Sequence, residues 1–381
     1  MALQVTGACA PVLDPLLAHV AGHVADGVLA PGAQLAVRHR GDWLVDAAVG
    51  TDGLGRPMLT DTRFALYCSG KPLAALAVAH VVERGGLTYD AALGDVLGDL
   101  VGSRLAPITV TNLLTHTAGL HHLTVTQAIL AGPRRRRELA LRVGPPRRWT
   151  IGRDIAYAEH GAWELLGRAI AATTGIAPAD YVREHVLAPL DLADDLSAVM
   201  TGDEYDRDLD RLGVNVYLRA NHHIPLLLER TRAFCTEEQL GYGARGSARA
   251  LAGLYAHLAQ VHAGATEDGV VTQAALQAAT APARPRGFDR ALGRDCDYGL
   301  GFMVGLSDHG FGRHPSPTAF GHSGYAGGSF GFADPVNDLA VALVYNGYID
   351  ADTSLRLRRE AVVGTLYRCL GIAIHPPSGP T

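Results

Sequence analysis

Strand-like segments lie towards both ends of this 381-residue chain, and a long helical stretch separates them. Residues 34–49 are predicted as two short strands around the turn Arg40-Gly41-Asp42. Three later strands are predicted at residues 299–304, 328–333 and 339–345. A sheet built from these strands must pair segments that are far apart in the chain, which indicates an α/β fold.

Helical patterns surround the strands and fill the middle of the chain. Amphipathic helices are expected at residues 12–28 and 354–370, near the two ends, and another helix at residues 248–261. A further helix begins at Lys71 and stops at the Gly85-Gly86 pair.

Two domains follow from this order of elements. We expect residues 1–67 and 241–381 to form an α/β sheet domain that the N- and C-terminal helices flank. Residues 68–240 are predicted to form a mostly helical domain.

The cations of the chain are almost all arginine. Of the 33 basic residues, 32 are arginine and one, Lys71, is lysine. Arginine stays protonated in proteins, whereas a lysine amine can lose its proton when its surroundings favour the neutral form. We therefore expect Lys71 to do something that arginine cannot; the alternative is that one lysine remains by chance.

Composition excludes several classes of protein. With 48% hydrophobic and 19% charged residues the chain can bury a sizeable core. A net charge of −5 argues against a nucleic-acid binder, and the basic run Arg134–Arg137 is interpreted as a solvated loop. No apolar run is long enough to span a membrane, and the first residues lack the basic start of a signal peptide, so we expect a cytoplasmic protein.

Cysteine and histidine spacing predicts neither a disulfide framework nor a metal site. The five cysteines are far apart, with no C-x-x-C pair, which is typical of free thiols. The histidines show no H-E-x-x-H or comparable ligand spacing. We expect no metal and no cofactor.

Several short motifs follow one another along the chain. In order they are Cys68-Ser-Gly-Lys71, Leu113-Leu-Thr-His-Thr-Ala-Gly-Leu120, Tyr157-Ala-Glu159, Gly243-Ala-Arg-Gly-Ser247, Asp297-Tyr-Gly-Leu-Gly301 and Phe320-Gly-His322-Ser-Gly324. Cys68 and Lys71 are three residues apart at the start of a helix, so their side chains share one helical face.

In this order the motifs resemble those of the serine β-lactamase-like family, which includes class C β-lactamases, DD-peptidases, family VIII esterases and related transacylases. That family has Ser-x-x-Lys, His-Thr-Ser-Gly-Leu, Tyr-x-Asn, a Gly-x-x-Ser-x-x-Asp-like helix start and Lys/His-Thr/Ser-Gly. The resemblance covers roughly residues 10–370. It implies an antiparallel sheet with terminal helices, a mostly helical lobe, and an active site between the two.

Two positions depart from the family pattern. Cys68 stands where the family has its nucleophilic serine, and Glu159 stands where it has the asparagine of Tyr-x-Asn. Ser69 lies only two residues before Lys71 and faces another side of the helix, which leaves Cys68 as the nucleophile. The alternatives are that Cys68, Lys71 and Tyr157 are relics in an inactive homologue, and that Glu159 only caps a helix.

The resemblance assigns roles to these residues. It places Glu159 near Lys71, so we expect a Cys68 thiolate, a Lys71 ammonium and a Glu159 carboxylate in the resting enzyme. Tyr157 is expected to be the general acid–base that relays a proton to the leaving group or from the incoming nucleophile. His116 is interpreted as a structural residue.

The last motif is expected to face the substrate. The main-chain N–H groups of Cys68 and Tyr325 are expected to form the oxyanion hole. His322 and Ser323 are expected to orient the substrate or Tyr157, and Gly324 lets its strand approach the acyl group closely.

An acyl-cysteine is a thioester, and a thioester reacts with amines, relative to water, more readily than an oxygen ester does. The sequence therefore predicts a transacylase that passes an acyl group from an ester or thioester donor to an amine or alcohol, by analogy with related transacylases of natural-product assembly. An esterase or β-lactamase-like hydrolase and an inactive ligand-binding homologue are the alternatives. The expected partners are small molecules, without nucleic acid or membrane, and the oligomeric state cannot be read from the sequence.

Overall fold

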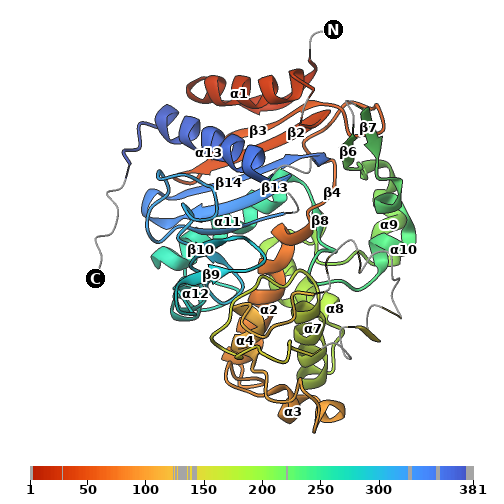
Figure 1. The fold of residues 1–381 in the computed structure, drawn as a ribbon. Coiled ribbons are helices and arrows are strands. Elements are labelled where there is room, and N and C mark those ends of the chain that lie inside the picture. The colour runs from red at the N-terminus through yellow and green to blue at the C-terminus, as the bar shows by residue number, and fades with distance from the viewer. Residues whose placement is uncertain are drawn as a thin grey trace.

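The structure is a computed structural model, and it describes residues 3–374 apart from positions 28, 123, 125–126, 128–134, 136–137, 140–143, 220–221, 325–327 and 349–351. A seven-stranded sheet forms its centre, in the order β1-β3-β2-β14-β13-β12-β11, with every neighbouring pair antiparallel (Figure 1). The strands are β1 Val5–Cys9, β2 Gly32–His39, β3 Asp42–Gly50, β11 Met303–Val304, β12 Phe320–Ser323, β13 Ser329–Asp334 and β14 Leu339–Tyr345.

Strand β14 joins the early and late parts of the chain. It pairs with β2 on one side and with β13 on the other, so that Leu343 lies opposite both Leu35 and Phe330. The predicted α/β fold with an antiparallel sheet of distant segments is therefore confirmed.

Helices cover both faces of this sheet (Figure 1). Alternate residues of β14 separate the two sides: Leu343 packs among apolar residues of α1 and α13, whereas Ala342 faces the core that contains α11. Because successive side chains of a strand point to opposite faces, a strand covered on both sides is apolar throughout. The three helices are α1 Asp14–Ala25, α11 Ala248–Ala263 and α13 Asp352–Cys369.

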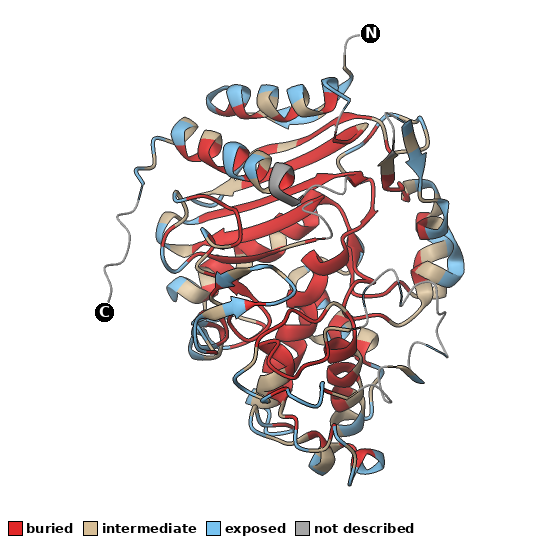
Figure 2. Cartoon of the chain, viewed as in Figure 1, coloured by how far each residue is buried: buried red, intermediate tan, exposed pale blue. Residues whose placement is uncertain are grey.

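The second lobe is built around α2, whose residues Lys71 to Val81 are all buried. Figure 2 shows the buried surfaces of α2 and α7 meeting inside this lobe. A helix that is apolar on every side belongs in a core, which explains why the sequence of α2 shows no polar face. Besides the three helices on the sheet, the described residues form α2 Lys71–Glu83, α3 Leu93–Val96, α4 Val110–Leu114, α7 Gly161–Thr174, α8 Pro178–Val182, α9 Gly202–Asp208, α10 Arg232–Thr236 and α12 Gln273–Thr280.

Besides the central sheet, the described residues form three small sheets of two or three strands. In one of them β8 pairs with β4, which leads directly into the Cys68 turn. The strands are β4 Phe64–Ala65, β5 Leu196–Ser197 and β8 Arg245–Gly246; β6 Val216–Arg219, β7 His222–Pro225 and β15 Gly347–Tyr348; and β9 Gly287–Asp289 with β10 Arg294–Cys296.

Several element boundaries differ from the sequence-based expectation. The strand expected at residues 299–304 is reduced to β11, because Gly301 has a φ of +87° that breaks the extended backbone. Helix α4 begins at Val110, and Thr109 before it forms a capping box with Asn112. Helix α7 begins at Gly161 with His160 as its N-cap, so Glu159 lies just before the helix.

Candidate active site

Cys68 lies in a tight turn between a strand and a helix. Strand β4 leads into a 3-10 turn over Tyr67–Gly70, and α2 begins at the next residue, Lys71. A Cβ at Gly70 would lie 2.0 Å from the Cβ of Ala244, so only glycine allows the turn to pack this closely against the segment before β8. Cys68 is 6% exposed, which places the thiol just beneath the surface of the protein.

Lys71 is fully buried, and its amine lies within hydrogen-bond distance of three acceptors. Its Nζ atom lies 3.2 Å from Cys68 Sγ, 2.9 Å from the main-chain oxygen of Glu159 and 2.7 Å from that of Gly241. An ammonium has three N–H donors, one for each acceptor. A neutral amine would donate to the two carbonyls and accept the thiol proton through its lone pair, so the same geometry fits both protonation states.

Burial lowers the pKa of Lys71, whereas the Cys68 sulfur and the Glu159 charge act in the opposite direction and raise it. The balance brings the amine closer to the range in which it can both give and take a proton. The proton can therefore pass between Sγ and Nζ without any movement of the chain.

Glu159 contacts Lys71 through its main chain. The hydrogen bond to Nζ comes from the carbonyl oxygen of Glu159, and its carboxylate acts on Lys71 through charge. The sequence-based expectation relied on the side chain, whereas the contact at 2.9 Å is one that any residue at this position could make.

Tyr157 lies beside the same pair. Its ring centroid is 5.2 Å from Lys71 Nζ, and its buried hydroxyl interacts with the Cys68 side chain without a well-formed hydrogen bond. Burial, followed by the charge of a Cys68 thiolate, raises the pKa of Tyr157 well above its usual value. The hydroxyl therefore keeps its proton at rest and is able to donate it.

A buried carboxylate positions Tyr157. Asp289 Oδ1 accepts hydrogen bonds from the main-chain N–H groups of Tyr157 at 2.9 Å, and of Ala291 and Leu292 at 3.0 Å. Its other oxygen lies 3.4 Å from Arg284, and both side chains of this ion pair are almost completely buried. Asp289, the last residue of β9, was not predicted as a site residue, because an acidic residue in a polar stretch of sequence carries no signal of burial.

The side chain of His322 is hydrogen-bonded to Tyr298. Its Nδ1 atom lies 2.9 Å from the carbonyl oxygen of Ser323 and must carry the proton, so Nε2 accepts the Tyr298 hydroxyl at 2.7 Å. Burial and the Lys71 charge lower the pKa of His322 well below 6.5, which keeps the ring neutral. The Tyr157 and His322 ring centroids are 6.1 Å apart, so His322 adjoins Tyr157 through ring packing.

The rest of this motif packs tightly against the Cys68 turn. A Cβ at Gly324 would lie 2.2 Å from Ser329 Oγ and 2.5 Å from the Leu66 oxygen, so this position requires glycine. Ser329 Oγ also lies 2.9 Å from Ser69 Oγ, which places Ser69 away from Lys71. The Ser323 hydroxyl lies 3.8 Å from the Met303 sulfur. Tyr325, the expected second donor of the oxyanion hole, lies outside the described residues.

His116 packs its ring on Tyr157 at 4.4 Å and on Tyr298 at 4.6 Å. Its Nδ1 atom accepts the main-chain N–H of Ala158 at 3.1 Å, although its backbone has a φ of +60°. Burial, Arg284 and Lys71 lower the pKa of His116 well below 6.5. The His116 ring is therefore uncharged and packs against Tyr157 and Tyr298 as a structural residue.

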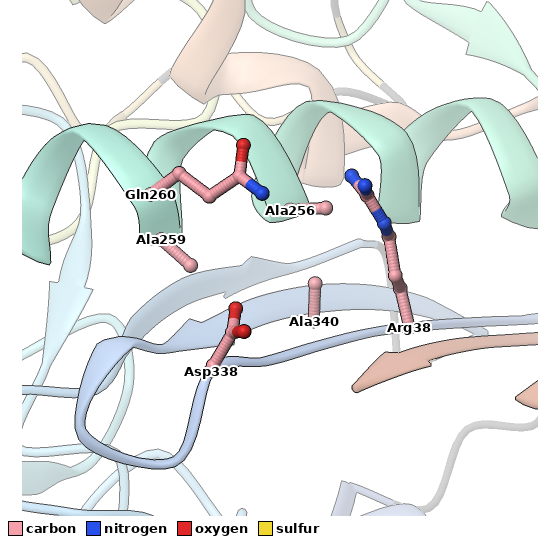
Figure 3. A pocket seen from close by; sticks show the side chains of 6 residues that line it. All are labelled: Arg38, Ala256, Ala259, Gln260, Asp338 and Ala340. Carbon is pink, nitrogen blue, oxygen red and sulfur yellow. The ribbon is translucent and has the colours of Figure 1, made fainter. Parts of the chain in front are cut away.

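Three kinds of feature matter in the rest of the described chain: a metal cluster, a membrane-spanning helix and a further pocket. No group of three or more histidine, cysteine or acidic side chains there could hold a metal ion. The described helices include none that is long and apolar enough to cross a bilayer. A small pocket between α11 and the β2–β14 pair is lined by Arg38, Ala256, Ala259, Gln260, Asp338 and Ala340, none of them a predicted site residue (Figure 3).

The chain is similar to esterases, acyltransferases and penicillin-binding proteins. It is 41% identical over 96 residues to esterase EstB of Burkholderia gladioli, covering 23% of this chain and 24% of EstB. It is 27% identical over 161 residues to acyltransferase mokF of Monascus pilosus, covering 36% of this chain and 38% of mokF. The matches thus span less than two fifths of either curated relative.

The structural likeness extends over the whole molecule. A penicillin-binding protein homologue from Caulobacter crescentus superposes with a TM-score of 0.78 and 27% identity, covering 96% of this chain and 100% of the homologue. The sequence profile described as Beta-lactamase matches residues 20–364, which include the Cys68 turn, Tyr157 and the His322 strand. The resemblance seen in the sequence is confirmed, and the chain belongs to the beta-lactamase family.

Proposed function

We propose that the protein is an acyl-transfer enzyme that works through a thioester on Cys68. The observation that carries this proposal is the distance of 3.2 Å between Cys68 Sγ and Lys71 Nζ, with two main-chain carbonyls holding the amine in place. A thiol becomes a strong nucleophile when a neighbouring group takes or stabilises its charge. Of the described cysteines, Cys68 is the one that lies against the only lysine.

In the first half-reaction the thiol proton passes to Lys71, and Sγ attacks the acyl carbonyl of an ester or thioester donor. A C–S bond forms, the bond to the leaving group breaks, and the leaving group takes a proton from Tyr157. Lys71 then returns the proton to Tyr157. The sum is an acyl-cysteine and a free alcohol or thiol.

In the second half-reaction an amine or alcohol attacks the thioester. Its proton passes to the neutral Lys71 amine, directly or through Tyr157, which gives its own hydroxyl proton to Lys71 as it takes the new one. The new C–N or C–O bond forms, the C–S bond breaks, and Lys71 returns the proton to Sγ, which restores the Cys68 thiol. A thioester favours an amine over water, which supports transfer over hydrolysis. The likeness to mokF, which is named an acyltransferase, supports the same outcome.

Hydrolysis is the second candidate function, since the protein is 41% identical over 96 residues to EstB, which is named an esterase. The two functions share the acyl-enzyme and differ only in what attacks it. The donor and acceptor are small molecules in both proposals.

Incubation with p-nitrophenyl acetate followed by intact-mass analysis and peptide mapping tests the acyl-enzyme. We expect one acetyl group on Cys68, no adduct on Cys68→Ala, and a normal adduct on Cys235→Ala, the matched loss of another buried thiol. Full turnover by Cys68→Ala, or ligand binding without any adduct on the wild type, contradicts the proposal.

The ratio of amide to acid formed in the presence of an added amine separates transfer from hydrolysis. We expect the wild type to favour the amide and Cys68→Ser to release more acid, because the serine variant forms an oxygen ester. An amide yield that does not rise with amine concentration would favour the hydrolase.

A further inference from the structure

The residue before the nucleophile has an unfavourable backbone conformation. Tyr67 has a φ of +52°, in the left-handed region, which costs a residue with a side chain about 1–3 kcal/mol. Such a conformation persists only where surrounding contacts determine it. Because Cys68 follows directly, the directions of its N–H and its Sγ depend on the backbone of Tyr67.

The hydroxyl at the end of the Tyr67 side chain is hydrogen-bonded to a buried carboxylate. The Tyr67 hydroxyl donates a hydrogen bond to Oε1 of Glu229, which lies in the 3-10 turn Leu227–Arg230 and is 2% exposed. Burial, followed by the Glu229 charge, raises the pKa of Tyr67 well above its usual value, so the hydroxyl remains a donor.

The second oxygen of Glu229 is also occupied. Oε2 accepts the main-chain N–H of Asn215 at 3.0 Å and its side-chain amide at 2.9 Å. The same amide lies 3.3 Å from the main-chain oxygen of Ala65, in the strand that leads to Tyr67. Glu229 therefore binds the Tyr67 side chain directly, and through Asn215 it is linked to the backbone of Ala65 before the turn.

The Tyr67 ring is fixed as well. It packs edge-on against the ring of Tyr348 with centroids 5.6 Å apart, and both residues belong to one buried cluster with Tyr242. With its ring and hydroxyl held, Tyr67 has no freedom to relax to an ordinary backbone conformation.

We propose that Glu229 is a positioning residue for the nucleophile: through the Tyr67 hydroxyl it holds the left-handed turn that places Cys68 Sγ against Lys71. This inference rests on the proposed function, but its first consequence concerns the thiol itself. If the turn relaxes, Sγ moves away from the Lys71 amine and the thiolate loses its nearest positive charge.

The rate of Cys68 alkylation by iodoacetamide, read by peptide mapping at neutral pH, tests this without any acyl substrate. We expect Tyr67→Phe to lower that rate about tenfold, and to lower kcat for p-nitrophenyl acetate by a similar factor while KM changes little. Glu229→Gln keeps an oxygen for the Tyr67 hydroxyl, so its rate should lie between those of the wild type and Glu229→Ala.

Tyr367→Phe is the matched control. Its hydroxyl donates to Oδ2 of buried Asp334 at 2.6 Å, a pair of the same chemistry between α13 and β13. The Tyr367→Phe variant should lose about as much free energy of unfolding as Tyr67→Phe, but its Cys68 should be alkylated at the wild-type rate. A folded Tyr67→Phe protein that alkylates at the wild-type rate overturns the proposal, as does equal slowing in Tyr367→Phe. Full turnover by Cys68→Ala would refute the proposed acyl-enzyme but leave the alkylation result standing.

Discussion

The Asp289 carboxylate lies beneath Tyr157 and accepts its main-chain N–H at 2.9 Å. Asp289→Ala would leave three main-chain N–H groups and the Arg284 guanidinium without their buried acceptor. We expect a loss of about 3–5 kcal/mol in the free energy of unfolding, measured by chemical denaturation. Asp297→Ala breaks a partly exposed pair with Arg286 and should cost less than about 1 kcal/mol. Equal losses in the two variants would refute this account.

Tyr157→Phe should separate activity from stability. The lost hydroxyl is buried beside the Cys68 side chain without a well-formed hydrogen bond, so the free energy of unfolding should change by less than about 1 kcal/mol. The kcat for p-nitrophenyl acetate should fall by about 10²–10⁴ because the proton donor is gone. Tyr298→Phe is the contrast, since its hydroxyl serves His322 and its loss should destabilise the protein. A clear loss of stability in Tyr157→Phe would show that its hydroxyl has a structural partner.

Lys71 and Glu159 should differ sharply in their sensitivity to substitution. Lys71→Arg places a larger, permanently charged group where three acceptors already surround the amine, so kcat should fall by about 10² or more. Glu159→Gln keeps the main-chain carbonyl that holds Lys71 and should stay within about tenfold of the wild type. Steady-state kinetics with p-nitrophenyl acetate measure both. Near-normal activity of Lys71→Arg would mean that only a positive charge is needed.

Buried neutral histidines should make the fold sensitive to acid. Burial lowers the pKa of His309 from 6.5 to about 4, so between these values the unfolded chain binds the proton more readily than the folded one. Stability is therefore lost as the pH falls through this window, by about 1.4 kcal/mol per pH unit for each such histidine. His309→Gln keeps a donor for the Asp297 carbonyl and should lower the slope by that amount. Urea unfolding at a series of pH values measures it, and an unchanged slope would exclude His309 as a source.

Much of the fold could be predicted from the sequence because its signals are local. Apolar segments bounded by turn residues identified β2, β3, β13 and β14, and longer apolar segments identified α2 and α11. The boundary at Gly301 was missed, because apolar patterning does not show which residue adopts a positive φ. The division into domains at residues 67 and 240 stays a prediction.

The candidate site was only partly predictable. The family resemblance pointed to Cys68, Lys71 and Tyr157, and the structure places Cys68 and Tyr157 beside the Lys71 amine. It did not reveal that Glu159 contacts Lys71 through its carbonyl, because main-chain acceptors leave no trace in residue type. Asp289 and Glu229 were missed for a related reason: their importance comes from burial in the folded chain.

The place of β14 in the sheet has a consequence for the order in which the protein folds. Strand β14 lies between β2 and β13, so the early hairpin of β2 and β3 has an open edge until residue 345 has left the ribosome. Strand β14 pairs with β2 between residues such as Leu339 and His39, at opposite ends of the chain, so the contact order is high and such a sheet closes slowly. The β2 edge is then the part of the nascent chain most open to wrong strand pairing, and assistance from chaperones would matter most during synthesis of the helical lobe.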